Sequence, residues 1–287
     1  MRGLDAILTY QDYPLSEAER STRKYRPLGL GVINYAYLLA KHGVTYSESN
    51  KKIKNEDGSI SLVKSHPAVK LTHQVMEALQ YHSMKASVQL AKEFGRCEGF
   101  ENTKLAKGSL PIDRYKKSID KVLEDNDANF YLQDWESLRK DLLTYGIRNA
   151  TLTAFMPSET SSQISNATNG IEPPRDLVSI KSSKDGILKQ VVPGIEDDVI
   201  KYNYELLWDQ PSPEGYITLV AVMQKFVDQA ISGNTSYNPN FFPEGKFSVK
   251  QLLRDLLLCH KLGWKTGYYF NTNDVAASEE DCDSCKI

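Results

Sequence analysis

The fold is decided by one stretch, which reads Thr151-Leu-Thr-Ala-Phe155 and continues as Met156-Pro-Ser-Glu-Thr-Ser-Ser-Gln-Ile-Ser-Asn-Ala-Thr-Asn-Gly-Ile-Glu-Pro-Pro174. Polar and apolar residues alternate in the first five positions, which predicts a strand. Further on, Thr160-Ser-Ser-Gln163 fits a capping box, which predicts the start of a helix. The stretch therefore predicts a strand that runs through a loop into a helix, the repeating unit of α/β folds.

The loop is rich in hydroxyl and amide side chains and carries only two charged residues among nineteen. Unpaired backbone N–H groups and the positive end of the helix dipole gather at a helix N-terminus. The hydroxyls of Ser158, Thr160, Ser161 and Ser162 can add donors, so the loop is suited to hold a phosphate. The local pattern alone favours a simpler interpretation, an ordinary capped helix after a polar loop.

Helical patterns dominate the rest of the chain, with strands between them. We expect helices over residues 28–42, 72–94, 134–145, 195–209, 215–231 and 248–262. Asp134 and Ser248 are predicted N-caps, and Gly146 a C-terminal signal. Strands are predicted over 148–156 and 265–272, and a hairpin is predicted with its turn at Asp57-Gly58. This alternation argues for an α/β architecture.

The composition is that of a globular chain. Its 287 residues are 40% hydrophobic and 25% charged, enough for a substantial core. A net charge of -2 gives no electrostatic reason to expect nucleic acid or a membrane surface as a partner. The sequence has no long apolar run and no signal-peptide pattern. Four cysteines are too few for a disulfide scaffold, so we expect a reducing, cytoplasmic setting.

Two adjacent tyrosines, Tyr268 and Tyr269, lie in the last predicted strand. Neighbouring residues of a strand point to opposite faces. The pattern alone therefore predicts one core ring and one half-buried ring.

The sequence ends in Cys282-Asp-Ser-Cys285-Lys-Ile. No second pair completes a tetrahedral zinc site, so a redox pair is the better interpretation. Residues 271–281 are polar and acidic, which predicts a mobile tail that spans roughly 18 Å root-mean-square. Asp281 and Asp283 disfavour a thiolate on their neighbours, which suits a pair that an external thioredoxin or glutaredoxin reduces.

The other cysteines and the histidines give no such signal. Cys259 lies on an apolar helical face and is expected to be a packed thiol, and Cys97 has no obvious partner. The five histidines are scattered without ligand spacing, so we assign no metal.

The loop, read from Pro157 to Arg175, resembles the substrate-phosphate loop of the class I ribonucleotide reductase large subunit. The resemblance extends over nearly the whole chain and corresponds to the C-terminal part of that subunit. It is carried by the stretches 28–41, 107–113, 183–193, 223–226, 265–269 and 282–287.

This resemblance implies the C-terminal portion of a ten-stranded α/β barrel, completed by a separate N-terminal chain. Residues 1–270 would form the later part of the barrel, and residues 271–287 a redox-active tail. The N-terminal sequence already resembles the interior of the subunit, which leaves an expression fragment or a naturally split subunit. The second resembles some T4-like bacteriophages, in which case the host cytoplasm is expected.

The resemblance also implies roles for individual residues. Pro157, Ser158, Glu159, Thr160 and Ser161 would hold the phosphates of a ribonucleoside diphosphate. Tyr268 and Tyr269 would relay a radical from the metal-containing small subunit. Cys282 and Cys285 would pass on reducing equivalents from thioredoxin or glutaredoxin, and no cofactor would be bound directly.

The motifs of the family's radical cysteine, of its active-site disulfide and of its allosteric regions do not occur in this sequence. We therefore expect the chain to be inactive alone. The alternative is a non-catalytic module that binds nucleotide diphosphates or another partner. The intact tyrosine pair and terminal cysteines argue against it.

Overall fold

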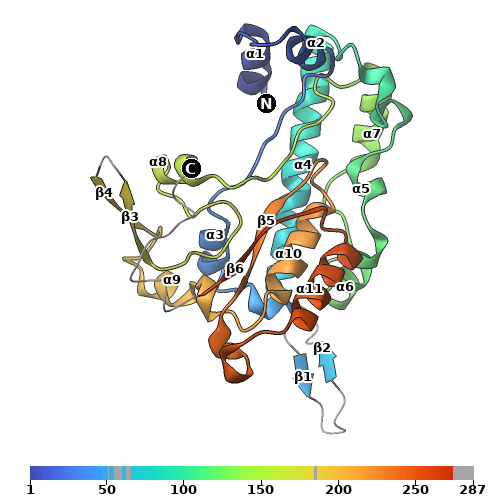
Figure 1. The fold of residues 1–287 in the computed structure, drawn as a ribbon. Helices are drawn as coiled ribbons and strands as arrows, with labels where there is room; N and C mark the ends of the chain where they lie inside the picture. The colour runs from blue at the N-terminus through green and yellow to red at the C-terminus, as the bar shows by residue number, and fades with distance from the viewer. Residues whose placement is uncertain (51, 55–59, 63–65, 184–185, 274–287) are drawn as a thin grey trace.

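The computed structural model describes residues 1–50, 52–54, 60–62, 66–183 and 186–273. Its centre is a set of extended segments that run parallel (Figure 1). Leu30 bridges Thr153, and Phe155 bridges Ile231. The sheet continues where β5 (Ser232–Tyr237) pairs in parallel with β6 (Thr266–Thr272). A parallel sheet with helices packed against it is the arrangement that an α/β barrel requires.

The helix predicted over 28–42 is wrong in its first half. Residues 28–30 are extended, because the N–H of Leu28 donates to the Thr151 oxygen at 3.0 Å and that of Leu30 to the Leu152 oxygen at 2.8 Å. A Cβ on Gly31 would lie 3.2 Å from the Ala154 oxygen, so glycine permits this close approach. Helix α3 (Tyr35–Lys41) begins only after Asn34.

Three other predicted elements differ in extent. In the predicted strand 148–156, Arg148 and Ala150 are bends, and Thr153 and Phe155 form isolated bridges. In place of one helix over 195–209 there are α9 (Asp198–Asn203) and a short 3-10 helix (Leu207–Asp209). Helix α10 (Glu214–Gln224) ends seven residues before the predicted limit of 231. Gln224 Nε2 donates to the Val227 and Gln229 oxygens and so stabilises the turn into β5.

The helices with strong local signals are confirmed. They are α4 (Pro67–Phe94), which begins five residues earlier than expected, α7 (Trp135–Tyr145) and α11 (Val249–Leu262). Asp134 accepts from the Ser137 N–H and Ser248 from the Gln251 N–H, so both predicted N-caps are present. Gly146 ends α7 with a φ of 73°, which favours glycine.

Two hairpins project from the body of the molecule (Figure 1). In the first, β1 (Lys52–Lys54) pairs with β2 (Ile60–Leu62) as predicted, and the predicted turn at 57–58 lies outside the described residues. The second, β3 (Val178–Ser183) with β4 (Gly186–Val191), was not predicted. The remaining α-helices in the described residues are α1 (Arg2–Tyr10), α2 (Ser16–Tyr25), α5 (Pro111–Arg114), α6 (Asp120–Asp125) and α8 (Glu159–Ile164).

Helix α10 is the centre of the core. It packs against α4, α11 and β5, and Figure 1 shows it between the β5–β6 sheet and α4. Every residue of α10 after Glu214 is buried. A helix that is apolar on all sides is stable only in such an interior position. None of the helices in the described ranges combines the length and apolar character that crossing a membrane requires.

A buried ion pair anchors the N-terminal helix to the strand that leads to the loop. Asp5 of α1 accepts from Arg26 Nε at 2.7 Å and from Asn149 Nδ2 at 2.9 Å. Burial alone would raise the pKa of the Asp5 carboxyl, but these hydrogen bonds and the charges of Arg26 and Arg148 hold it below its ordinary value. Asn149 lies directly before the extended segment that carries the predicted phosphate loop.

Candidate functional site

The predicted phosphate loop follows the carboxyl end of the extended segment 151–155. Helix α8 begins at Glu159 with Ser158 as its N-cap residue, and Ser158 makes no side-chain capping bond. The predicted capping box is therefore wrong, because Thr160 lies inside the first turn and not at the cap. The first turn still leaves the backbone N–H groups of residues 159–161 outside the helix's own hydrogen bonds.

Hydrogen bonds from the segment that follows α8 hold the loop in place. The N–H of Ser158 donates to Asn169 Oδ1 at 2.9 Å. The neighbouring Thr168 makes two hydrogen bonds with Asn34. The Thr168 N–H donates to Asn34 Oδ1 at 3.0 Å, and the Thr168 carbonyl oxygen accepts from the Asn34 N–H at 2.9 Å. Asn34 adopts a left-handed φ of 67°, a conformation that asparagine tolerates better than most residues. The loop is thus held in one shape while Pro157, Thr160 and Ser161 remain exposed.

Ser158 differs from its neighbours in the loop. Its Oγ is screened from solvent and has no hydrogen-bond partner within the described part of the chain. An unsatisfied buried hydroxyl is costly, and most buried polar groups in folded proteins have a partner.

The two tyrosines of β6 lie on the same side of the strand, contrary to the alternation expected from the sequence. Their ring centroids are 4.1 Å apart, and the rings are tilted by 51°. The cause is a shift in register: Gly233 pairs with Gly267 and Thr235 with Phe270, so Asn234 alone faces both tyrosines. Two residues opposite one is the pattern of a β-bulge.

Both rings are open to solvent, with exposed fractions of 52% for Tyr268 and 56% for Tyr269. Their hydroxyls are 3.4 Å apart, and the hydrogen bond from Tyr269 to Tyr268 raises the pKa of Tyr269. Tyr269 therefore keeps its proton at neutral pH. A protonated phenol beside a second phenol can give up an electron and a proton together.

Two residues to which the sequence assigned no role connect the tyrosine pair to the polar run that begins with the loop. The N–H of Tyr269 donates to Asn234 Oδ1 at 2.9 Å, and the N–H of Asn234 donates to Glu172 Oε1 at 3.1 Å. Glu172 belongs to the polar run that begins with the loop. For Glu172, its place in that run was a sequence signal that could have been used. For Asn234, the local sequence carries no signal.

The predicted cysteine pair, Cys282 and Cys285, lies outside the described residues, so its role stays a prediction. The other two cysteines are free thiols, Cys97 buried and Cys259 partly buried. Burial raises the pKa of Cys97, and it raises that of Cys259 to about 12. Both stay protonated and unreactive near neutral pH.

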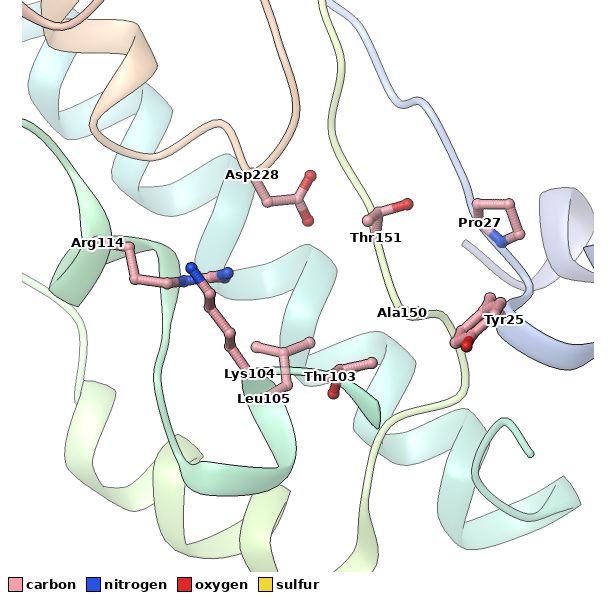
Figure 2. A pocket seen from close by; sticks show the side chains of 9 residues that line it. All are labelled: Tyr25, Pro27, Thr103, Lys104, Leu105, Arg114, Ala150, Thr151 and Asp228. Carbon is pink, nitrogen blue, oxygen red and sulfur yellow. The ribbon is translucent and has the colours of Figure 1, made fainter. Parts of the chain in front are cut away.

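A cavity of about 360 Å³ lies at the opposite, amino end of the extended segment (Figure 2). Asp228 and Arg114 contribute to its lining. The Asp228 carboxylate accepts from the N–H groups of Leu152 and Thr153 at 2.8 and 3.1 Å, so it fixes the start of the strand. Of the predicted site residues that the structure describes, none lines this cavity.

Comparison with known proteins gives consistent matches over the whole chain. The family model described as "Ribonucleotide reductase, barrel domain" matches residues 1–270. The ribonucleoside-diphosphate reductase subunit alpha of Haemophilus influenzae is 57% identical over 100% of this chain and 36% of its own length. The corresponding subunit of Escherichia coli is 54% identical over 96% of this chain and 33% of its own. That of Enterobacteria phage T4 is 42% identical over 100% of this chain and 36% of its own. The chain thus spans about a third of the length of these relatives.

Proposed function

Since the chain belongs to the family of the ribonucleotide reductase barrel domain, we propose that it supplies the C-terminal part of the catalytic barrel of a class I ribonucleoside-diphosphate reductase. The enzyme would reduce ribonucleoside diphosphates to deoxyribonucleoside diphosphates. The observation that supports this best is the bulged tyrosine pair, which is exposed, has its ring centroids 4.1 Å apart and is bonded through Asn234 to Glu172, in the polar run that begins with the loop.

Substrate binding is assigned to the loop from Pro157 to Ser161. The diphosphate would accept hydrogen bonds from the backbone N–H groups of residues 159–161 and from the hydroxyls of Ser158, Thr160 and Ser161. The first turn of α8 gives these donors a common direction, and the hydrogen bond to Asn169 keeps them in place before the substrate arrives.

Radical transfer is assigned to Tyr268 and Tyr269. The metal-containing small subunit would supply the oxidising equivalent, and in each step an intact phenol would give one electron and one proton to the neighbouring phenoxyl radical and become the radical itself. The pair lies on β6, at the open side of the described sheet, where further strands of the barrel and the small subunit can reach it.

Reduction of the active-site disulfide is assigned to Cys282 and Cys285. They would take up two electrons from thioredoxin or glutaredoxin by disulfide exchange and pass them inward. These reductants belong to the cytoplasm, which is therefore where we place the reaction. Residues 1–270 would act as the barrel part and 271–287 as the tail that carries the pair.

Activity also requires the remainder of the alpha subunit. The chain spans about a third of its relatives, and the motif of the radical cysteine does not occur in it. The remainder would provide that cysteine, the other barrel strands and the regulatory regions. A diphosphate-binding module without catalysis is the alternative, but it would need only the loop and would have no use for an exposed tyrosine pair.

A single hydroxyl tests the substrate-binding assignment. Ser158→Ala removes no hydrogen bond within the described protein, so the unfolding midpoint should change little. A charge-assisted hydrogen bond to phosphate is worth about 1.5–3 kcal/mol, so diphosphate affinity in the assembled enzyme should fall by about 10- to 100-fold. Ser165→Ala, at the exposed far end of α8, is the matched control and should leave the affinity unchanged. Equal affinities for all three proteins, measured by calorimetry, would remove Ser158 from the site.

A further inference from the structure

The shared face of Tyr268 and Tyr269 needs an explanation, because consecutive residues of a regular strand point in opposite directions. The bulge provides it. One residue of β5, Asn234, lies opposite both tyrosines, so β6 contains one residue more than its partner at this point. Without the bulge one ring would turn away, and the 4.1 Å separation of the ring centroids would be lost.

A bulge creates a need that a regular ladder does not have. The extra residue loses its place in the backbone ladder, and its N–H must find another acceptor. The N–H of Tyr269 finds it in the side chain of Asn234, at 2.9 Å from Oδ1. An oxygen acceptor on a short side chain is what this position requires, and aspartate is the closest substitute for asparagine.

The acceptor is itself fixed in position. The backbone N–H of Asn234 donates to Glu172 Oε1 at 3.1 Å, which ties β5 to the polar run that begins with the loop. The preceding Gly233 lies so close to the core that a Cβ there would be 2.5 Å from Tyr216 Oη and 2.8 Å from Trp264 Cζ2. Asn234 therefore has little freedom to move along or away from the sheet.

We infer that Asn234 is a positioning residue of the radical relay, which holds the rings of Tyr268 and Tyr269 together on one face by accepting the N–H that the bulge releases. Glu172 sets the place of Asn234 and so couples the loop to the tyrosine pair. This inference rests on the proposed relay function of the pair. The local geometry, however, can be tested without any activity.

The geometric test uses hydrogen exchange in this chain labelled with [15N]tyrosine, with the Tyr269 signal identified by its absence in Tyr269→Phe. In the unmodified chain the Tyr269 amide should be protected from exchange, and rapid exchange there would already overturn the inference. In Asn234→Leu, which keeps the branching and the number of side-chain heavy atoms but has no acceptor, the Tyr269 amide should exchange about tenfold faster or more. Asn234→Asp keeps an oxygen in place and should retain the protection.

Two references separate a local effect from general unfolding. The Tyr237 amide, also on β5, should stay protected in every variant. Ser236→Ala removes the hydroxyl that accepts from Asn271 Nδ2 in the same pair of strands, and it should leave Tyr269 unchanged. If the Tyr237 amide also loses its protection in Asn234→Leu, the smaller substitution Asn234→Ala is used instead. The role of the Asn234 side chain would be refuted if the Tyr269 amide stayed protected in Asn234→Leu or Asn234→Ala, in a variant whose Tyr237 amide is also protected.

The functional test uses the assembled enzyme. Asn234→Leu should lower kcat by about tenfold or more with KM unchanged, because a misplaced relay slows transfer without affecting the phosphate loop. Asn234→Asp should restore most of kcat. If Tyr269→Phe abolishes turnover while Asn234→Leu leaves kcat unchanged, the positioning role fails and the relay stands. If neither variant affects turnover, the proposed relay itself fails.

Discussion

Tyr268→Phe and Tyr269→Phe are each expected to abolish turnover in the assembled enzyme while leaving folding and substrate binding intact. Phenylalanine keeps the ring but has no phenolic hydrogen, so an electron and a proton can no longer leave together. More than half of each ring is exposed, and the only hydroxyl contact described is the one between the pair, so little stability is at risk. The loss should exceed about 10³-fold, equivalent to about 4 kcal/mol of barrier.

The control for this result is Tyr202→Phe, at a tyrosine on α9 that is 82% exposed and has no proposed role. Deoxyribonucleotide formation is measured with both thioredoxin and a small dithiol as reductant. The tyrosine variants should fail with both, because the relay precedes any use of reductant. Retention of more than a tenth of the turnover by either variant would exclude that tyrosine from the relay.

Cys282→Ser and Cys285→Ser should give a different pattern of loss. Serine cannot form a disulfide, so electrons from thioredoxin or glutaredoxin should no longer reach the active site, and activity with these proteins should fall to background. A small dithiol that reaches the buried disulfide directly should still support turnover, because the radical path is untouched. The contrast between the two reductants identifies a shuttle.

Cys259→Ala is the matched control for the terminal pair. Its thiol is partly buried and kept protonated by a raised pKa, so it should not take part in exchange, and activity with both reductants should persist. If the terminal cysteine variants lose activity equally with thioredoxin and with the small dithiol, the pair belongs to the active site or to the fold. The shuttle assignment would then be wrong.

Elements with signals inside their own sequence were predicted well. Helix α7 carries an N-cap residue and a following glycine within one short stretch, α11 carries an N-cap residue, and the structure uses all three signals. The extended conformation of residues 28–30 could not be foreseen, because their hydrogen-bond partners at 151 and 152 lie more than a hundred residues away. An apolar run without its partner strand reads equally well as a buried helix.

The local sequence did not predict that α4 buries polar residues. Glu77 is fully buried and accepts from the N–H groups of Leu132 and Gln133 and from Trp135 Nε1. Its carboxylate thus satisfies the hydrogen-bond donors of a segment far along the chain. A charged residue in a helix pattern is ordinarily assigned to the solvent face. Only the tertiary contact reveals that it belongs to the core.

At the tyrosine pair, the resemblance to the family and the geometry of the fold give different information about the site. Resemblance to the family pointed to Tyr268 and Tyr269, whereas strand alternation placed their rings on opposite faces. The bulge resolves this conflict, and it depends on Asn234, more than thirty residues earlier in the chain. Registers between distant strands are not encoded in a short motif, so this part of the site became visible only in the fold.

Reconstitution tests the central claim most directly. The chain is mixed with a polypeptide that carries the remainder of the alpha subunit, the small subunit and thioredoxin, and conversion of a labelled ribonucleoside diphosphate is followed. We expect deoxyribonucleoside diphosphate from the complete mixture and none when either this chain or the remainder of the alpha subunit is left out. Turnover by this chain with the small subunit alone, or equal turnover of the mixture without this chain, would contradict the proposed function.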